Sequence, residues 1–590
     1  MVDYSIKDIY QGGYSSFSPK YGDAFTGYKL NPKTLGMTTD PSTANVLQDV
    51  STKLNMGVKQ IELSLVSPEV FDSVPKQQLK EINRLSKLTG VDVSIHAPVM
   101  DSAGMSQQGF SEMNRELAER KISDILIRSH EVNPEGNVPV TFHSAEGMPG
   151  SEWKTLGAKG KGREAKKIIA VEKESGKMMP LEREERFIPT ERGIVKEEWS
   201  PEKNLEIVNH TEWDSKISQL FFNKERADEI LEKNQIQIQH LIQDIKGGGI
   251  DEKGLTPTQE QAYLKMKDAE NYLSEITKNA NSLFSRAYEF GNAEQKEKLK
   301  KISELYAKDL NENKGDMIGQ SKAMHKLLIN MQTSELAPEM YVPIEQFAVE
   351  KSSETFGNAA FNAYKKFGDK SPILSIENPP AGFALSTGED LKNLIEGSRK
   401  QFVEKAVKEG IDERTAKKSA ERLIGATWDV GHINMLRKEG FGKEDIIKET
   451  EKIAPLIKHV HLSDNFGFEH TELPMGMGNV PVKEILEKLG KEGFDAKKII
   501  EAGQWWRHFK TAPFKETLEA FGSPIYSMNM APYWNQNLGL QQGYYPGLTG
   551  QWLPQTNYEV FGTGFSRLPT DLGGQRGGGE GNRMSGRPME

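Results

Sequence analysis

The chain has 590 residues, about two to four times the length of a typical single domain, so it has room for a large core and for further modules. It contains no cysteine, which excludes disulfides, thiolate zinc sites, Cys-ligated iron–sulfur clusters and cysteine nucleophiles, so a transition metal would be bound by His, Asp or Glu. Its 76 Lys and Arg against 85 Asp and Glu give a formal charge of −9, which argues against a broadly basic surface that coats nucleic acid.

The N-terminal segment lacks a basic stretch followed by an apolar stretch, and no apolar run in the chain approaches twenty residues. We therefore expect a cytoplasmic protein that does not interact with membranes. We assign residues 1–33 to an N-terminal extension.

Short apolar runs that end in polar residues recur along the chain, and a helix-like stretch follows each of them. Strands that alternate with helices predict parallel pairing through right-handed crossovers, and eight such units close a (β/α)8 TIM barrel of the α/β class. An open doubly wound sheet is the alternative, but the glycine-rich phosphate loop typical of that fold is missing after the first run. The eight predicted strands are Thr34–Thr39, Val58–Leu65, Val91–Ala97, Val138–Ser144, Pro372–Asn378, Gly425–Val430, Lys458–Asp464 and Lys498–Gly503.

A long insertion separates the fourth and fifth predicted strands, so the barrel halves are residues 34–145 and 343–519. Within residues 146–342 we expect a β-hairpin over Ala165–Ile188, turning at Ser175-Gly176, and then a mainly helical domain. Its mixed-charge helices are typical of a packing or self-association module rather than a catalytic one. The predicted helices are Asp214–Ile245, Pro257–Phe290 and Ala293–Asp309.

Residues 520–590 form a tail rich in Tyr, Asn, Gln, Gly and Pro. Such a composition cannot bury a core of its own. We interpret this segment as a linker or tail, with single-strand nucleic-acid binding as the less favoured alternative.

Residues able to bind metals stand at or just beyond the ends of the third to eighth predicted strands. Because the C-terminal ends of barrel strands meet on one face, we expect these side chains to converge. Burying so many ionisable groups together without a cation would be costly, although a single His or Glu ending a strand is usually structural. The candidate ligands are His96, His143, Glu377, Asp429, His432, His461, His470, Glu472 and Glu501.

Histidines and carboxylates without thiolates favour Zn²⁺, Mn²⁺, Fe²⁺ or Co²⁺. The full set exceeds the needs of one ion, so two or three ions sharing carboxylates are predicted, an arrangement suited to displacement at phosphorus. A single ion held by a subset would instead suit the polarisation of a sugar hydroxy-carbonyl, with Glu377 and Glu501 as catalytic groups that move a proton. That subset is Glu377, Asp429, His461 and Glu501.

The ordered motifs of the two barrel halves resemble the xylose isomerase-like TIM barrel superfamily, which includes endonuclease IV and sugar isomerases and epimerases. These motifs are Ser94-Ile-His96-Ala-Pro, Phe142-His143, Ile376-Glu377-Asn378, Trp428-Asp429-Val-Gly-His432, Val460-His461-Leu-Ser-Asp464, His470-Thr-Glu472 followed by Leu-Pro-Met-Gly-Met-Gly478, and Ile500-Glu501. The insertion and the tail lie outside the resemblance.

The endonuclease IV branch holds three zinc ions. The resemblance implies that His96, His143 and Glu377 hold the first ion and that His432 helps to hold the third. It also implies that Glu377 bridges to a second ion, which is bound by Asp429, His461 and Glu501 as well. Epimerases resemble this chain only at Glu377, Asp429, His461 and Glu501. The presence of both His96 and His143 therefore favours the endonuclease IV branch.

The chain also departs from the endonuclease IV pattern. His470-x-Glu472 reverses the Asp-x-His order of that family, which puts the third ion in doubt. Thr38-Thr39 stands where that family has a histidine, and Met477 replaces the glutamate of its Gly-Glu-Gly turn.

Three functions follow from these observations as expectations. The first is a metal-dependent phosphodiesterase that cleaves DNA 5′ to abasic sites with two or three Zn²⁺ ions. The second is an isomerase or epimerase of a small sugar or sugar phosphate with one Mn²⁺, Co²⁺ or Mg²⁺ ion. The third is a non-catalytic scaffold. The expected partners are accordingly abasic DNA or a small sugar, with self-association through the helical insertion.

Overall fold

The computed structural model describes residues 35–489 and 496–502, together with scattered positions from 505 to 517. Within these ranges it leaves out residues 56–57, 107–108, 156–162, 192, 235, 239, 241–254, 315 and 334–335. The predicted N-terminal extension and tail therefore lie outside the described residues. The chain divides into a barrel unit (Met1–Val171, Ser175–Pro180 and Pro343–Glu590) and a helical unit (Glu172–Glu174 and Leu181–Val342).

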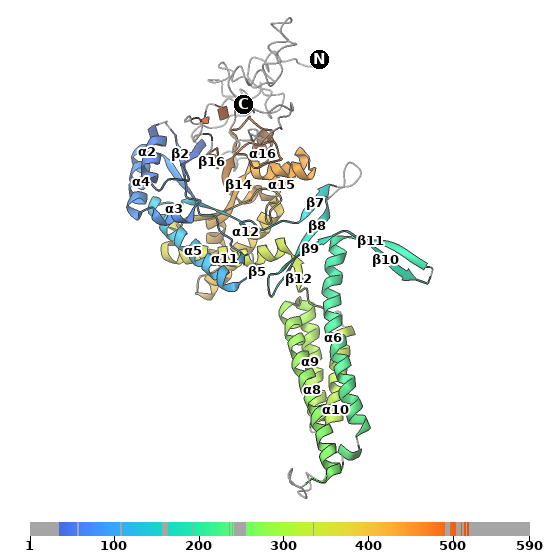
Figure 1. Cartoon of the computed structure of the whole chain (residues 1–590). Helices are drawn as coiled ribbons and strands as arrows, with labels where there is room; N and C mark the ends of the chain where they lie inside the picture. The colour runs from blue at the N-terminus through green and yellow to red at the C-terminus, as the bar shows by residue number, and fades with distance from the viewer. Residues whose placement is uncertain are drawn as a thin grey trace. The chain divides into compact units, whose positions relative to one another are not determined.

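Eight parallel strands close into one barrel in the order β1-β16-β15-β14-β13-β6-β3-β2 (Figure 1). Each strand falls on one of the eight predicted runs, so the prediction of a TIM barrel is confirmed. The strands are β1 (Leu35–Thr38), β2 (Gln60–Ser64), β3 (Asp92–His96), β6 (Pro139–His143), β13 (Ile373–Glu377), β14 (Ile424–Asp429), β15 (Ile457–Leu462) and β16 (Lys497–Ile500).

Alternation along these strands separates an apolar outer face from a polar interior. Paired residues of a parallel ladder point to the same face, and the ladder pairs Glu62 with Ser94, Glu377 with His143, and Asp429 with His461. The intervening side chains, among them Phe142 and Trp428, are apolar and buried. The apolar side chains of the strands therefore pack outward against the helices, and polar and ionisable side chains line the barrel interior.

Helices cover the outside of the barrel (Figure 1). Side-chain caps start several of them, as where Thr387 accepts a hydrogen bond from the Asp390 amide at the start of α12. These helices are α2 (Val46–Asn55), α3 (Pro68–Ser73), α4 (Lys76–Thr89), α5 (Glu112–Ser129), α11 (Ile344–Phe367), α12 (Gly388–Lys408), α13 (Glu413–Leu423), α15 (Lys443–Ile453) and α16 (Val482–Lys488). The short helix α14 (Val430–Asn434) directly follows β14 and is buried. A short ribbon of β4 (Met105–Ser106) and β5 (Gly109–Phe110) follows β3.

The insertion begins with β7 (Glu152–Thr155), which pairs antiparallel with β8 (Arg163–Glu172). β9 (Met178–Glu182) then returns along β8, with the turn near the predicted Ser175-Gly176. The hairpin is shorter than expected, because residues 184–190 pair with a later strand instead. They form the ribbon of β10 (Glu184–Thr190) and β11 (Gly193–Trp199).

Four helices make up most of the helical unit and run side by side (Figure 1). They are α6 (Pro201–Lys233), α8 (Pro257–Phe290), α9 (Ala293–Glu312) and α10 (Met317–Thr333). α8 has the predicted bounds because Thr256 and Gln259 form a capping box before its first turn. α6 begins 13 residues before the predicted Asp214, where Ser200 caps its first turn, and α10 was not predicted. The strand β12 (Tyr341–Pro343) ends the insertion.

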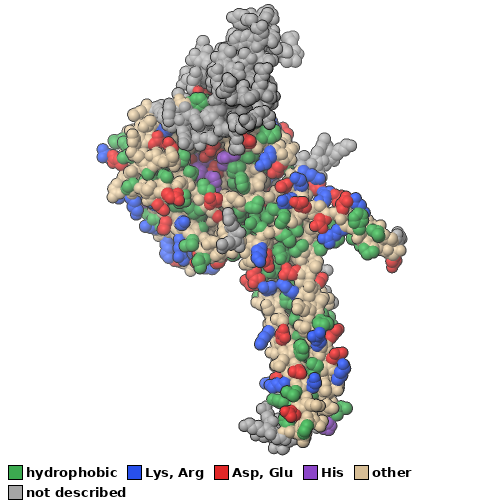
Figure 2. Space-filling model, viewed as in Figure 1, with side chains coloured by type: hydrophobic (Ala, Val, Ile, Leu, Met, Phe, Trp, Pro, Cys, Tyr) green, Lys and Arg blue, Asp and Glu red, His purple; other side chains and the backbone are tan. Residues whose placement is uncertain are grey.

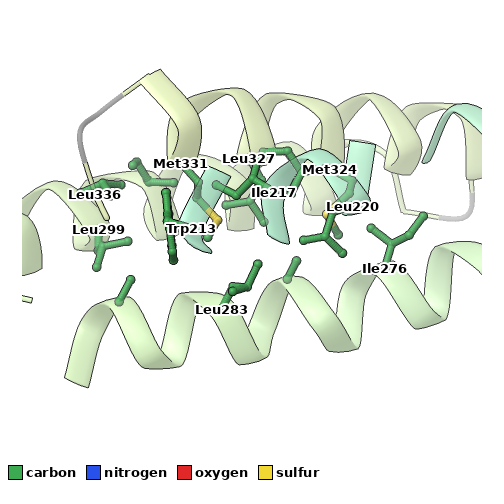
Figure 3. Close-up of a cluster of buried hydrophobic side chains, with 14 residues drawn as sticks. Trp213, Ile217, Leu220, Ile276, Leu283, Leu299, Met324, Leu327, Met331 and Leu336 are labelled. Atoms are coloured by element: carbon green, nitrogen blue, oxygen red, sulfur yellow. The ribbon is translucent and has the colours of Figure 1, made fainter. Parts of the chain in front are cut away.

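A continuous apolar core holds the four helices together (Figure 3). Trp213 and Ile217 of α6, Ile276 of α8 and Leu299 of α9 are among its buried members. Because each helix contributes one apolar stripe, the unit has the packing of a helical bundle, with a hydrophobic core of its own.

Substitutions at two leucines of α9, one buried and one exposed, test the packing of this core. Leu299 is fully buried, whereas Leu305 is 58% exposed. We expect Leu299→Ala to destabilise the helical unit by about 2–5 kcal/mol through lost burial and a residual cavity. Leu305→Ala should stay within about 0.5 kcal/mol. Urea unfolding of the full chain, followed by circular dichroism, measures both, and equal losses in the two variants would contradict the packing described.

None of the helices in the described ranges combines the length and the apolar composition needed to cross a bilayer.

Candidate metal centre

The predicted ligands gather at the C-terminal mouth of the barrel. His96, His143, Glu377 and Asp429 are the last residues of β3, β6, β13 and β14. Glu501 directly follows β16 and donates its backbone amide to Leu462 at the end of β15. Figure 2 shows histidine and acidic side chains together in a hollow of the barrel unit's face. The barrel topology thus joins residues that are hundreds of positions apart in the sequence.

Glu377 stands at the middle of this group, and its two carboxylate oxygens face different partners. Oε2 lies 3.1 Å from His96 Nε2 and 3.3 Å from His143 Nε2. Oε1 lies 2.7 Å from His461 Nδ1, which is in turn 3.1 Å from Glu501 Oε2. One fully buried carboxylate therefore contacts histidines on two sides of the mouth, and the donor atoms of His96, His461 and Glu501 also lie within 4.8 Å of one another.

Two sets of these residues have the composition of metal sites. The donor atoms of Glu377, Asp429, His461 and Glu501 lie within 4.8 Å of one another, and so do those of His96, His143 and Glu377. Each set combines nitrogen and oxygen ligands, which suits Zn²⁺, Mn²⁺ or Co²⁺ better than Mg²⁺.

The hydrogen bonds of two histidines test whether these residues fit a cation. His96 Nδ1 donates to the Ala97 carbonyl at 3.1 Å, and His432 Nδ1 donates to the Asn378 carbonyl at 2.7 Å. In a neutral imidazole the other ring nitrogen then carries a lone pair, and in His96 it faces the carboxylate of Glu377. Two acceptors that face each other need either a proton or a cation between them, so the residues fit a divalent metal.

His432 and His470 form a further contact at the rim. Their Nε2 atoms are 2.8 Å apart, with His432 buried and His470 exposed. Among the described residues, however, neither they nor Glu472 join a group of three or more candidate ligands within 4.8 Å. The predicted ligands of a third ion are thus only partly brought together.

The Asp429-Val-Gly-His432 motif has a local structural explanation. Asp429 Oδ1 accepts hydrogen bonds from the amides of Gly431 at 2.6 Å and His432 at 2.8 Å, which caps α14. Ser463 Oγ also donates to this oxygen, at 3.1 Å. A Cβ at Gly431 would lie 2.1 Å from Ser463 Oγ, so glycine is needed there. These contacts aim the carboxylate of Asp429 at Glu377 and His461.

Burial and mutual repulsion shift the pKa values of the carboxyl groups. Burial raises the pKa of Asp429 to about 7 and that of Glu472 to about 8, with a contribution from the charge of Glu501 in both. For Glu501 the charge and hydrogen bond of His461 outweigh burial and lower the pKa to about 2.

The pKa values of the histidines are also shifted in opposite directions. Burial opposes protonation of His96, but the hydrogen bond and charge of Glu377 outweigh it and raise its pKa to about 9. At His143 burial outweighs the charge of Glu377 and, with the charges of His96 and His432, lowers the pKa to about 4. Without a metal, the mouth thus holds a mixture of protonated and ionised side chains. A bound cation would displace the protons from these side chains.

Sequence reasoning missed Glu62, which lies one layer below the mouth in β2. Its Oε1 is 3.0 Å from His461 Nε2, and its Oε2 is 2.9 Å from both His459 Nε2 and Ser94 Oγ. The available signal was an acidic residue in the middle of the predicted strand Val58–Leu65 rather than at its end. His459 is fully buried against Glu62.

Asp464 organises the loop after β15. Its carboxylate accepts hydrogen bonds from the amides of Gly476 at 2.8 Å and Val480 at 3.0 Å. It therefore fixes the segment that carries His470 and Glu472 rather than joining the candidate ligands.

Comparisons with known proteins agree with this architecture. Residues 409–521, which include six of the candidate ligands, match the family model described as xylose isomerase-like TIM barrel. Over 78 residues the chain is 35% identical to Uncharacterized protein MJ1311 of Methanocaldococcus jannaschii, which is 13% of this chain and 25% of that protein. The chain thus spans a quarter of the length of this curated relative.

A solved structure, titled as the crystal structure of a D-tagatose 3-epimerase-like protein, superposes with a TM-score of 0.36 at 13% identity. The superposition covers 83% of this chain and 99% of that one. Members of the matched superfamily are generally enzymes, and they commonly bind divalent metals. The family match over residues 409–521 and the closed barrel of eight parallel strands support the resemblance of this chain to the xylose isomerase-like TIM barrel superfamily.

Proposed function

We propose that this protein is a metal-dependent phosphodiesterase, and most concretely an endonuclease that cleaves DNA 5′ to abasic sites. The observation that carries the proposal is the division of Glu377, with one oxygen toward His96 and His143 and the other toward His461. A carboxylate placed in this way suits a bridge between two ions, and paired ions are suited to displacement at phosphorus.

The candidate ligands would be shared between two ions. His96, His143 and Glu377 would hold one ion, and Asp429, His461 and Glu501 would hold a second ion together with Glu377. Bound divalent cations would supply Lewis acidity toward a phosphate ester. The chain itself orients its ligands, since the Ala97 and Asn378 carbonyls hold the rings of His96 and His432 with Nε2 toward the mouth.

Cleavage of a duplex with one abasic site, compared with the intact duplex in the presence of Zn²⁺, tests the proposal. We expect a nick 5′ to the abasic site in wild type and a loss of more than about 100-fold in the His96→Ala, His143→Ala double variant, together with one fewer ion per chain. The control is His210→Ala, an exposed histidine of the helical unit, which should match wild type. Absence of cleavage by zinc-loaded wild type would contradict the proposed activity.

A sugar isomerase or epimerase is the second candidate, because Glu377, Asp429, His461 and Glu501 alone make a complete site for one ion. In that reaction Glu377 and Glu501 would move a proton between carbons of the substrate. Incorporation of solvent deuterium into candidate sugars, retained in the double variant, would favour this candidate. A protein that binds metal but turns over neither substrate class would be assigned to the scaffold alternative.

A further inference from the structure

The side chain of His461 connects the candidate metal centre to a buried polar layer beneath it. Its Nδ1 faces Glu377 Oε1 at 2.7 Å and Glu501 Oε2 at 3.1 Å, whereas its Nε2 lies 3.0 Å from Glu62 Oε1. His461, Glu62 and Glu377 are all fully buried. The ring therefore has one nitrogen in each layer.

Glu62 is an uncommon residue for its position. The interior layers of such barrels are usually filled by bulky branched apolar side chains, and a buried carboxylate is costly unless it is paired and hydrogen-bonded. Packing alone would not select a glutamate in the middle of β2.

The two oxygens of Glu62 have separate partners. Ser94 Oγ donates to Oε2 at 2.9 Å, and His459 Nε2 lies 2.9 Å from the same oxygen. Oε1 has no hydrogen-bond partner in the described part of the chain, and it lies 3.0 Å from His461 Nε2, which likewise has none. The neighbours of Glu62 thus hold the carboxylate with one oxygen free for the ring.

On the basis of the proposed function, we propose that Glu62 is a positioning residue of the metal centre. Its carboxylate keeps the proton of neutral His461 on Nε2, so that Nδ1 presents a lone pair toward Glu377 and Glu501. Without Glu62 the buried Nε2 would have no carboxylate oxygen 3.0 Å away, and the ring would place its proton on Nδ1, where Glu377 Oε1 lies 2.7 Å away. That tautomer cannot bind a cation through Nδ1. Carboxylates behind metal-bound histidines fix the tautomer and ring orientation in this way.

The test is metal affinity, measured by chelator competition with Co²⁺ on the full chain. Glu62→Gln is expected to weaken Co²⁺ binding about 10- to 100-fold and to alter the visible absorption bands of the bound cobalt. Ser375→Ala is the matched control, because Ser375 is a fully buried polar residue of a barrel strand and accepts a hydrogen bond from Thr427 at 2.7 Å. It should keep the wild-type affinity to within about twofold and leave the cobalt bands unchanged.

A second variant keeps the inference testable if Glu62→Gln folds poorly. Glu62→Asp retains the negative charge and should bind Co²⁺ with an affinity between those of wild type and Glu62→Gln. Equal losses in both variants with unchanged cobalt bands would assign Glu62 to packing and overturn the inference, as would a folded Glu62→Gln protein with wild-type affinity. If wild type itself binds no metal, the proposed function fails instead, so the two failures are distinguishable.

Discussion

The Glu377→Gln variant is expected to lose metal and activity together. The side chain is fully buried and supplies an oxygen to both ligand sets, so removing its charge weakens two sites with one substitution. Loss of a partner behind a ligand typically costs about 10- to 100-fold, and loss of a shared ligand should exceed that range. We expect less than one ion per chain by elemental analysis, and cleavage of abasic DNA reduced more than about 100-fold.

The matched control is Glu487→Gln, which changes an exposed glutamate of α16. It should retain the wild-type metal content and activity, because exposed substitutions of this kind usually change stability by no more than about 0.5 kcal/mol. A Glu377→Gln protein that keeps its full metal content would contradict the shared-ligand geometry.

Removal of metal is expected to destabilise the barrel unit, and the more so at higher pH. A ligand that binds only the folded state stabilises it by about 4 kcal/mol at a free concentration a thousand times its Kd. In the metal-free protein the stability should itself fall as pH rises from 6.5 to 9. The measurement is thermal unfolding of chelator-treated and zinc-loaded protein at pH 6.5 and 8.5.

The sign follows from the pKa shifts. The pKa values of Asp429, Glu472 and His96 are raised to about 7, 8 and 9 in the folded protein, so it binds more protons than the unfolded chain. Their stabilisation is present below the unfolded pKa values and is lost as pH rises through the folded ones, by up to about 1.4 kcal/mol per pH unit for each group that titrates. The lowered pKa of His143, about 4, makes stability fall only below pH 6.5, outside this window.

Zinc displaces these protons, so its stabilising effect should be larger at pH 8.5 than at pH 6.5. The Leu299→Ala variant serves as the control, because it identifies which unfolding transition belongs to the helical unit. A zinc-induced shift in the barrel transition that is equal at both pH values would contradict this account.

Much of the barrel could be predicted from local sequence signals. Each strand falls on a short β-rich run, several of which end at a polar residue, as at Glu377 and Asp429, and the number of runs matches the closed barrel found. The bounds of α8 were also predictable, because its capping box lies within the sequence that forms the helix. The hairpin of the insertion was overextended, because an apolar β-rich run does not specify which strand its later residues pair with.

The candidate ligands also could be predicted from the sequence only in part. The types of residue that end the strands predicted a metal centre at the barrel mouth, since chain order and strand direction already place those ends on one face. The division of the Glu377 oxygens between His96 and His461 could not be predicted, because it depends on side-chain rotamers and strand register. The contact between Glu62 and His461 likewise joins residues 399 positions apart across the barrel interior.

The amino-acid sequence was therefore sufficient for the fold class and for the chemistry available at the mouth, because periodicity and residue type are local properties of the chain. Which oxygen faces which nitrogen, and which buried group stands behind a ligand, was decided only by the closure of the barrel. The physical reason is that hydrogen bonds and metal coordination are selective over tenths of an ångström, and only the packed tertiary structure sets distances on that scale.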